Sequence, residues 1–208
     1  MSETKPESRR PPQFELIAGN LCLDFINTLD NRPSGKPTEL LKDSHDLARF
    51  GADAGILTPA QLDYFQKARL KTDETQDTLR RARKLREALY AIFSALLNGQ
   101  KAPQTGMDIL NASVHDAALH SRLVQLGERC EWRFEDLGSS LGSILWPIAR
   151  TAADLLASDQ VSFVRACSSP TCQWFFLDTS KNHHRRWCSM KLCGNRDKVR
   201  RFYARQNS

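Results

Sequence analysis

Four cysteines near the end of the chain form two pairs with equal spacing. Four residues lie inside each pair and fifteen lie between the pairs, which consist of Cys167, Cys172, Cys188 and Cys193. Four thiolates are the ligand set of a closed, tetrahedral structural zinc site. In a reducing compartment, clustered cysteine pairs are more often metal ligands than disulfides. We therefore expect these four cysteines to bind Zn²⁺.

The segment that carries these cysteines is strongly basic. Residues 165 to 208 hold ten Lys and Arg against two acidic residues, for +8, whereas the other 164 residues hold 20 basic and 22 acidic residues, for −2, which together give the net charge of +6. A four-thiolate zinc site has a formal charge of −2, so it balances only about two of these positive charges. A basic face beside zinc is typical of nucleic-acid binding, although a solvated face without a partner remains an alternative. The expected nucleic-acid contacts are Arg185, Arg186, Arg196, Lys198, Arg201 and Arg205.

The residues around the cysteine pairs predict a treble-clef-like zinc finger. Residues 161 to 167 favour a strand that leads to the first pair. Residues 173 to 187 read as an aromatic strand, a polar turn and a returning strand, and residues 194 to 206 have a helical pattern. The last thiolate would then lie at the N-terminus of a helix, where backbone N–H groups favour its negative charge.

The preceding part of the chain predicts a mainly helical domain with a small β element, so the fold class is α+β. A short helix is expected after Asn20, a helix beginning near Ser44, another capped by Thr58, and a long amphipathic helix over residues 73 to 98. Further helices are expected over residues 107 to 120 and 140 to 157, the latter kinked or starting late because of Pro147. Residues 123 to 134 predict a β-hairpin whose Cys130, Trp132 and Phe134 point inward.

These patterns divide the chain into three parts. Residues 1–12 are expected to form a disordered tail, since they are polar and rich in proline, residues 13–160 an α+β domain, and residues 161–208 the zinc finger. No segment approaches the roughly 18 consecutive apolar residues of a membrane span, and the first residues do not resemble a signal peptide. We expect a soluble cytoplasmic protein, without a membrane partner, in which Cys22 and Cys130 are buried thiols.

Polar residues within the apolar N-terminal segment suggest a second site. Asp24, Asn27 and Thr28, together with Arg86 of the long helix, could line a pocket for a small-molecule effector. Internal hydrogen bonding is the alternative explanation for these side chains. The sequence lacks the common catalytic motifs, and a zinc ion with four cysteine ligands has no open position for water. We therefore expect no catalytic residues and no enzymatic activity.

The run Cys193–Gly194–Asn195–Arg196, together with the upstream cysteines, resembles the signature of the CGNR zinc-finger family. Three upstream segments, at residues 19 to 32, 79 to 93 and 145 to 158, are similar to the ABATE-type domain that precedes this finger. The resemblance covers nearly the whole chain after residue 12. It implies that the four cysteines are zinc ligands and that the protein is a stress-induced transcription regulator.

The residues and the resemblance together predict a zinc-binding, DNA-binding transcription regulator that acts on double-stranded DNA. Two alternatives remain: a zinc-stabilised module whose basic face binds an acidic protein, and an RNA-binding module. A single finger usually needs a second copy to be selective for DNA, which makes a homodimer an expectation of the first interpretation.

Overall fold

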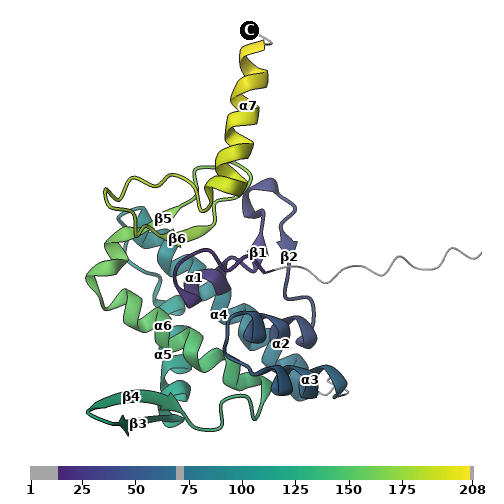
Figure 1. Ribbon diagram of the computed structural model, residues 1–208, viewed down its shortest axis with the longest axis vertical. Coiled ribbons are helices and arrows are strands. Elements are labelled where there is room, and N and C mark those ends of the chain that lie inside the picture. The colour runs from purple at the N-terminus through teal and green to yellow at the C-terminus, as the bar shows by residue number, and fades with distance from the viewer. Residues whose placement is uncertain (1–13, 69–72, 207–208) are drawn as a thin grey trace, which may run out of the picture.

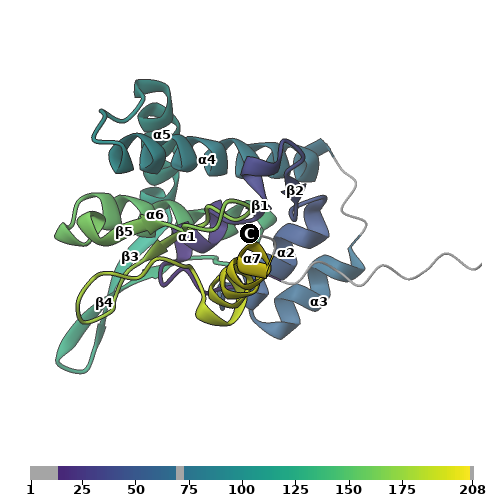
Figure 2. The ribbon, with the colours of Figure 1, turned by 90° about the horizontal axis from the view of Figure 1, so that it is seen from above.

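The computed structural model describes residues 14–68 and 73–206. The predicted tail, residues 1–12, lies outside the described residues. The helices are α1 (Leu21–Ile26), α2 (Ser44–Asp53), α3 (Pro59–Lys67), α4 (Asp73–Leu97), α5 (Gln104–Leu119), α6 (Leu145–Leu156) and α7 (Asn195–Gln206). Helix α5 packs between α4 and α6, α1 packs on α6 and α4, and α2 and α3 cover one end of this group (Figures 1 and 2). Helix α7 projects from the body at the end where the finger lies (Figure 1).

Three antiparallel sheets, each of two strands, complete the described part of the chain. They pair β1 (Leu29–Asp30) with β2 (Thr38–Glu39), β3 (Ser121–Leu126) with β4 (Arg129–Phe134), and β5 (Val164–Ala166) with β6 (Phe175–Leu177). Short 3₁₀ turns cover residues 32–34, 141–144 and 159–163, and a π-helical turn covers residues 190–194. The predicted class, mainly helical with small β elements and a four-cysteine finger, is confirmed. No helix among the described residues has both the length and the apolar composition of a membrane span.

Local capping signals placed several helices correctly. The Asn20 side chain accepts a hydrogen bond from the N–H of Cys22 at the start of α1, and Thr58 and Gln61 form a complete capping box at the start of α3. Helix α6 starts late, at Leu145, so that Pro147 lies in its first turn, where a backbone N–H needs no helical partner.

The prediction for the finger strands was wrong in its pairing. Residues 175–177 do form a strand, but it pairs with residues 164–166 before the first cysteine pair and not with the returning segment near residue 185. The first cysteine pair therefore lies in the loop of the β5–β6 hairpin. The returning segment is held instead by a backbone hydrogen bond from the N–H of Ser168 to the carbonyl of Arg186 at 2.8 Å and by hydrogen bonds of the Asp178 and Arg185 side chains.

The face of the β3–β4 hairpin that points toward the body was predicted correctly, since Phe134 is half-buried near Trp146 and Arg150 lies over Trp132, but the burial predicted for Cys130 and Trp132 was wrong. Strand β4 pairs with β3 in the register that places Leu123 opposite Trp132. Trp132 is 59% exposed and Cys130 is also exposed, whereas Cys22 is fully buried as expected. The hairpin extends beyond the helices at the end of the molecule opposite α7 (Figures 1 and 2). Apolar residues therefore gather on one face of β4, but no helix covers most of that face.

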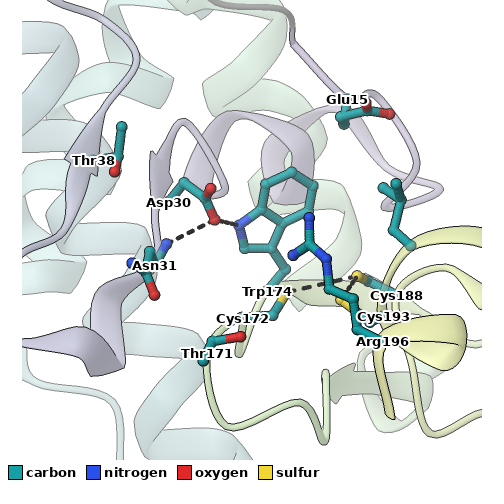
Figure 3. Close-up of a pocket in the computed structure, with 11 residues that line it drawn as sticks. Glu15, Asp30, Asn31, Thr38, Thr171, Cys172, Trp174, Cys188, Cys193 and Arg196 are labelled. Carbon is teal, nitrogen blue, oxygen red and sulfur yellow. Dashed lines mark hydrogen bonds between the residues drawn. The ribbon is translucent and has the colours of Figure 1, made fainter. Parts of the chain in front are cut away.

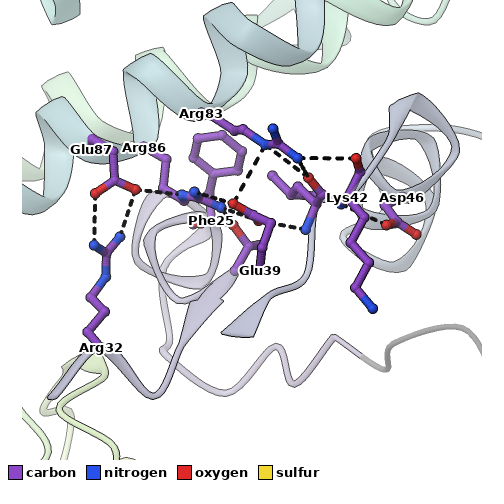
Figure 4. A network of polar contacts seen from close by, with 10 residues as sticks. Phe25, Arg32, Glu39, Lys42, Asp46, Arg83, Arg86 and Glu87 are labelled. Carbon is purple, nitrogen blue, oxygen red and sulfur yellow. Dashed lines mark hydrogen bonds and ion pairs between the residues drawn. The ribbon is translucent and has the colours of Figure 1, made fainter. Parts of the chain in front are cut away.

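A network of ion pairs anchors the loop between β1 and β2 to helix α4 (Figure 4). The guanidinium of Arg86, which is only 3% exposed, faces the two carboxylate oxygens of Glu39 at 2.6 Å each. Arg32 makes a second two-point contact, with Glu87, at 2.8 and 3.1 Å. Burial alone would raise the pKa of Glu87, but Arg32 and Arg86 hold it below its ordinary value. Bidentate contacts fix orientation as well as distance, so these two pairs orient the loop against α4.

Candidate metal centre and basic helix

The four predicted cysteines meet at one point. Their sulfur atoms all lie within 4.8 Å of one another, and all four side chains are buried. The Cys172 and Cys193 sulfurs each lie 3.7 Å from that of Cys188. In a tetrahedral site with zinc–sulfur bonds of about 2.3 Å, neighbouring sulfurs are about 3.8 Å apart. The donor set and its spacing therefore fit a zinc ion held by Cys167, Cys172, Cys188 and Cys193.

The first cysteine pair is shaped by the β5–β6 hairpin. Beyond Ala166 and Phe175, the last residue pair of β5 and β6, the N–H of Cys167 donates to the carbonyl of Trp174 at 2.8 Å. This hydrogen bond continues the strand pairing into the loop. The N–H of Cys172 donates to the carbonyl of Ser169 at 3.0 Å, closing a tight turn. Gln173 then takes a left-handed conformation with φ 54°, which returns the chain to β6. The four intervening residues thus bring both sulfurs to one side of the loop.

The second pair is shaped by the π-helical turn that leads into α7. Cys193 lies in this turn, which begins after Ser189, whose hydroxyl accepts from the N–H of Leu192. A Cβ atom at Gly194 would come within 2.9 Å of the Met190 sulfur, so a larger residue would require Met190 to move. The Asn195 side chain donates to the carbonyl of Lys191 at 3.1 Å, which stabilises the turn.

Without a cation, the four thiols do not all ionise: hydrogen bonds from Cys172 and Cys188 lower the pKa of Cys167, and the pKa values of the other three are raised. Burial, followed by the charge of Cys167, raises the pKa of Cys193 above its ordinary value. Zinc reverses this preference because it binds the thiolate form and releases the protons. The residues that lie against the sulfurs would therefore be held in place most firmly when the ion is bound.

Polar contacts hold the segment between the two cysteine pairs. The buried carboxylate of Asp178 accepts from the N–H of Ser180 at 3.0 Å and from that of Arg185 at 2.8 Å. The guanidinium of Arg185 lies over the ring of Phe176 at 4.6 Å and donates to the carbonyls of Trp187 and Cys188. Arg185 is thus engaged in the structure of the finger itself.

Strand β6 of the finger is docked on the N-terminal helices. The side-chain amide of Asn27 donates to the carbonyl of Phe175 at 2.9 Å and accepts from its N–H at 3.0 Å. Tyr90 of α4 stacks on Phe175 with ring centroids 5.2 Å apart. The N–H of Leu177 donates to the carbonyl of Ala18 at 2.7 Å. The finger and the helices consequently share one core.

The other residues predicted to line an effector pocket are also engaged internally. Asp24 accepts from the N–H of Ala18 at 2.9 Å, and burial raises the pKa of its carboxyl to about 6. The Thr28 hydroxyl donates to the carbonyl of Phe25 at 2.7 Å, and Arg86 pairs with Glu39 as described above. Neither these residues nor Asn27 line the cleft described next, and a pocket formed by them stays a prediction.

A cleft of about 300 Å³ lies between the finger and the β1–β2 loop (Figure 3). Arg196 extends from the start of α7 toward the indole of Trp174, whose Nε1 donates to Asp30 at 2.8 Å. The side-chain oxygen of Asn31 is buried and has no hydrogen-bond partner among the described residues. The residues that line the cleft are Glu15, Asp30, Asn31, Thr38, Thr171, Cys172, Trp174, Cys188, Leu192, Cys193 and Arg196. Sequence reasoning missed this cleft because its walls come from segments over 100 residues apart in sequence.

The predicted nucleic-acid contacts lie in different surroundings. Arg186 and Lys198 are exposed, and Arg186 lies 5.2 Å over the ring of Trp187. Arg185 is engaged inside the finger and Arg196 borders the cleft, while the side chains of Arg201 and Arg205 lie outside what the structure describes. Helix α7 also exposes apolar side chains, at 55% for Val199, 58% for Phe202 and 60% for Tyr203.

Comparison with family models decides the classification. Residues 19–159 match the ABATE family, described as "Putative stress-induced transcription regulator". The chain belongs to the ABATE family. Residues 164–206 of this ABATE chain match the CGNR zinc finger, so the resemblance inferred from the cysteines and the CGNR run is confirmed. Neither family is a family of enzymes, and no curated protein matches the chain.

The CGNR finger and its four clustered cysteines indicate that the ABATE protein binds zinc. The matched segments fall within the predicted domains, whose limits at residues 13, 160 and 161 stay a prediction. A regulatory, zinc-binding role is thus supported at the level of the family.

Zinc binding by these cysteines predicts a sharp difference between two substitutions. Cys172→Ser removes a ligand and should lower zinc affinity by roughly two orders of magnitude or more, since even changes behind the ligands typically cost 10- to 100-fold. Cys130→Ser, at the exposed cysteine of the hairpin, should leave zinc affinity unchanged. The measurement is competition with a chromogenic chelator. Equal zinc retention by the two variants would exclude Cys172 as a ligand.

Proposed function

We propose that this protein is a DNA-binding transcription regulator whose zinc finger presents helix α7 to duplex DNA. The observation that carries the proposal is the position of α7, which begins directly at the zinc site and projects from the body (Figure 1). Its twelve residues include five basic residues and one acid, Asp197. A positively charged helix that leaves the protein surface can reach phosphates or enter a major groove.

Lys198 is the residue best placed to test this interface. It is exposed on α7 and forms no ion pair with any residue that the structure describes, unlike Arg200, which pairs with Asp197. Arg186, exposed on the preceding segment, is a further candidate for phosphate contact. Arg185 is engaged inside the finger, and Arg196, although exposed, borders the cleft, so the proposed surface rests on Lys198 and Arg186, with Arg201 and Arg205 added from the sequence.

Lys198→Ala should weaken binding to duplex DNA by on the order of 1 kcal/mol, a several-fold change in Kd. Because one phosphate contact is lost, the slope of log K against log salt should become less steep by about 0.9. The matched control is Lys101→Ala, an exposed lysine between α4 and α5. Fluorescence anisotropy over a series of salt concentrations measures both quantities. Equal losses in the two variants would contradict the assignment of α7.

A second candidate, binding of single-stranded RNA, is favoured by the exposed aromatic residues of α7. Bases without partners stack on exposed aromatic rings, and Phe202 and Tyr203 are such rings. The same anisotropy experiment with single strands of equal length separates the two. Tighter binding to the duplex supports the first proposal, tighter binding to RNA strands supports the second, and binding to neither favours an acidic protein as the partner of the basic face.

We also propose that the cleft beside the finger receives a small anionic or zwitterionic effector. Arg196 supplies a cation, Asn31 a free acceptor and Trp174 an aromatic wall, and the volume suits a molecule the size of an amino acid. Because the cleft is bounded by both the finger and the β1–β2 loop, a ligand there would bias their relative position. The catalytic motifs absent from the sequence are also absent from this cleft, so we propose binding without chemistry.

The effector proposal predicts ligand-dependent stabilisation that requires Arg196. At a concentration about 100-fold above its Kd, a ligand stabilises the folded state by about 2.7 kcal/mol, which raises Tm by roughly 5–10 °C in a chain of this size. A thermal-shift series with free amino acids and small carboxylates should contain at least one such compound. Arg196→Gln should abolish its effect while zinc content is unchanged. A series without any shift would remove the proposal.

A further inference from the structure

The outer edge of strand β4 is a free strand edge at the surface. Strand β4 pairs with β3 alone in the described part of the chain. A two-residue loop connects Leu126 to Arg129, and the N–H of Glu135 donates to the carbonyl of His120 at 2.8 Å. The odd-numbered residues of β4 therefore bond to β3, while the backbone groups of Cys130, Trp132 and Phe134 point outward. These three residues offer donors and acceptors to a further strand.

The charged residues of β4 have no partners within the hairpin. Arg129, Glu131 and Arg133 are all exposed, and no ion pair in the described part of the chain includes any of them. Arg133 lies opposite Arg122, a like-charge pair that is unfavourable in an isolated hairpin. Arg122 in turn pairs with Glu135 at 2.5 Å. The exposed charges alternate in sign along the strand, in the order Arg129, Glu131, Arg133, Glu135.

We propose that β4 pairs antiparallel with β4 of a second copy of this chain, in the register centred on Trp132. Cys130 then faces the partner's Phe134, and Trp132 faces the partner's Trp132. The outward N–H and C=O groups of the two strands are thereby brought opposite each other. Arg129 faces Glu135 of the partner subunit, and Glu131 faces Arg133 of the partner subunit. Each pair occurs twice by symmetry, and every facing pair of charges is opposite in sign.

Charge selects this register over its neighbours. The backbone pattern allows only registers that pair even-numbered residues with each other. A shift that centres the pairing on residue 131 places Glu131 against its own copy and Arg129 against the partner's Arg133. A shift that centres it on residue 133 places Arg133 against its own copy and Glu131 against the partner's Glu135. Both neighbouring registers bring like charges together, which disfavours them.

Pairing would also complete an apolar surface. Trp132 and Leu123 face each other on one side of the hairpin and are 59% and 53% exposed. The same side also contacts the body, because the guanidinium of Arg150 lies 5.1 Å from the Trp132 ring and Phe134 lies 6.2 Å from the Trp146 ring. Two hairpins joined along β4 would form a four-stranded sheet with a continuous apolar stripe. Sheets of this size are stable where isolated hairpins are marginal.

The test is charge reversal followed by sedimentation equilibrium of the zinc-loaded chain. The wild type should dimerise in the micromolar range. Glu131→Arg turns two attractive pairs into repulsive ones and should weaken dimerisation roughly 10- to 100-fold. Arg133→Glu should have a similar effect. The double variant, Glu131→Arg with Arg133→Glu, restores opposite charges in both pairs and should return the affinity to within a few-fold of wild type.

Two controls separate this result from a general loss of structure. Asp53→Arg makes the same type of charge reversal at an exposed position on α2 and should leave dimerisation unchanged. Native Cys130 reports on the register, since the proposed pairing keeps the two Cys130 Cα atoms about 14 Å apart, too far for a disulfide. A monomeric wild type, a double variant as weak as the single ones, or a ready Cys130 disulfide between copies would overturn the proposal.

Discussion

The two-way hydrogen bond between Asn27 and the backbone of Phe175 is the contact on which the arrangement of this protein depends. Within residues 14–68 and 73–206, strand β6 has a single neighbouring strand, and the Asn27 amide takes the place of another at one residue. Around it, Tyr90 stacks on the Phe175 ring and the carbonyl of Ala18 receives the N–H of Leu177. Leaving a buried donor or acceptor without a partner costs about 1–3 kcal/mol, so these groups favour a docked finger over a detached one. The zinc site is in this sense an extension of the helical core.

This docking also sets the geometry of the proposed functions. The β1–β2 loop is fixed against α4 by Arg86 and Arg32, and the finger is fixed against α1 by Asn27, so the cleft between them has defined walls. Helix α7 begins at the sulfur cluster, and its direction is therefore tied to the metal site and through it to the body (Figure 1). A ligand in the cleft and a nucleic acid on α7 would both act on the contact between the finger and the body. The β3–β4 hairpin lies at the other end of the molecule, where association of two copies would leave α7 accessible.

The parts of this structure that sequence could predict are those with local causes. The capping box at Thr58 and Gln61, the apolar stripe of α4 and the cysteine spacing each act within a few residues, and each was predicted correctly. The partner of β6 was mispredicted because strand pairing depends on contacts across the fold. The burial of Trp132 was mispredicted because the alternation of apolar and charged residues identifies one face of a strand without showing what covers that face. Asn27 was recognised as an unusual polar residue, but its partner, a backbone 148 residues away, left no local signal.

Hydrogen–deuterium exchange, measured with and without zinc, tests most directly whether the finger and the helices form one core. Removal of zinc should speed exchange in the finger and also in α1 and in the part of α4 around Tyr90, because these segments lose the partner that covers them. Faster exchange confined to residues 164–206, with α1 and α4 fully protected, would show that the finger is an independent unit and would contradict this account.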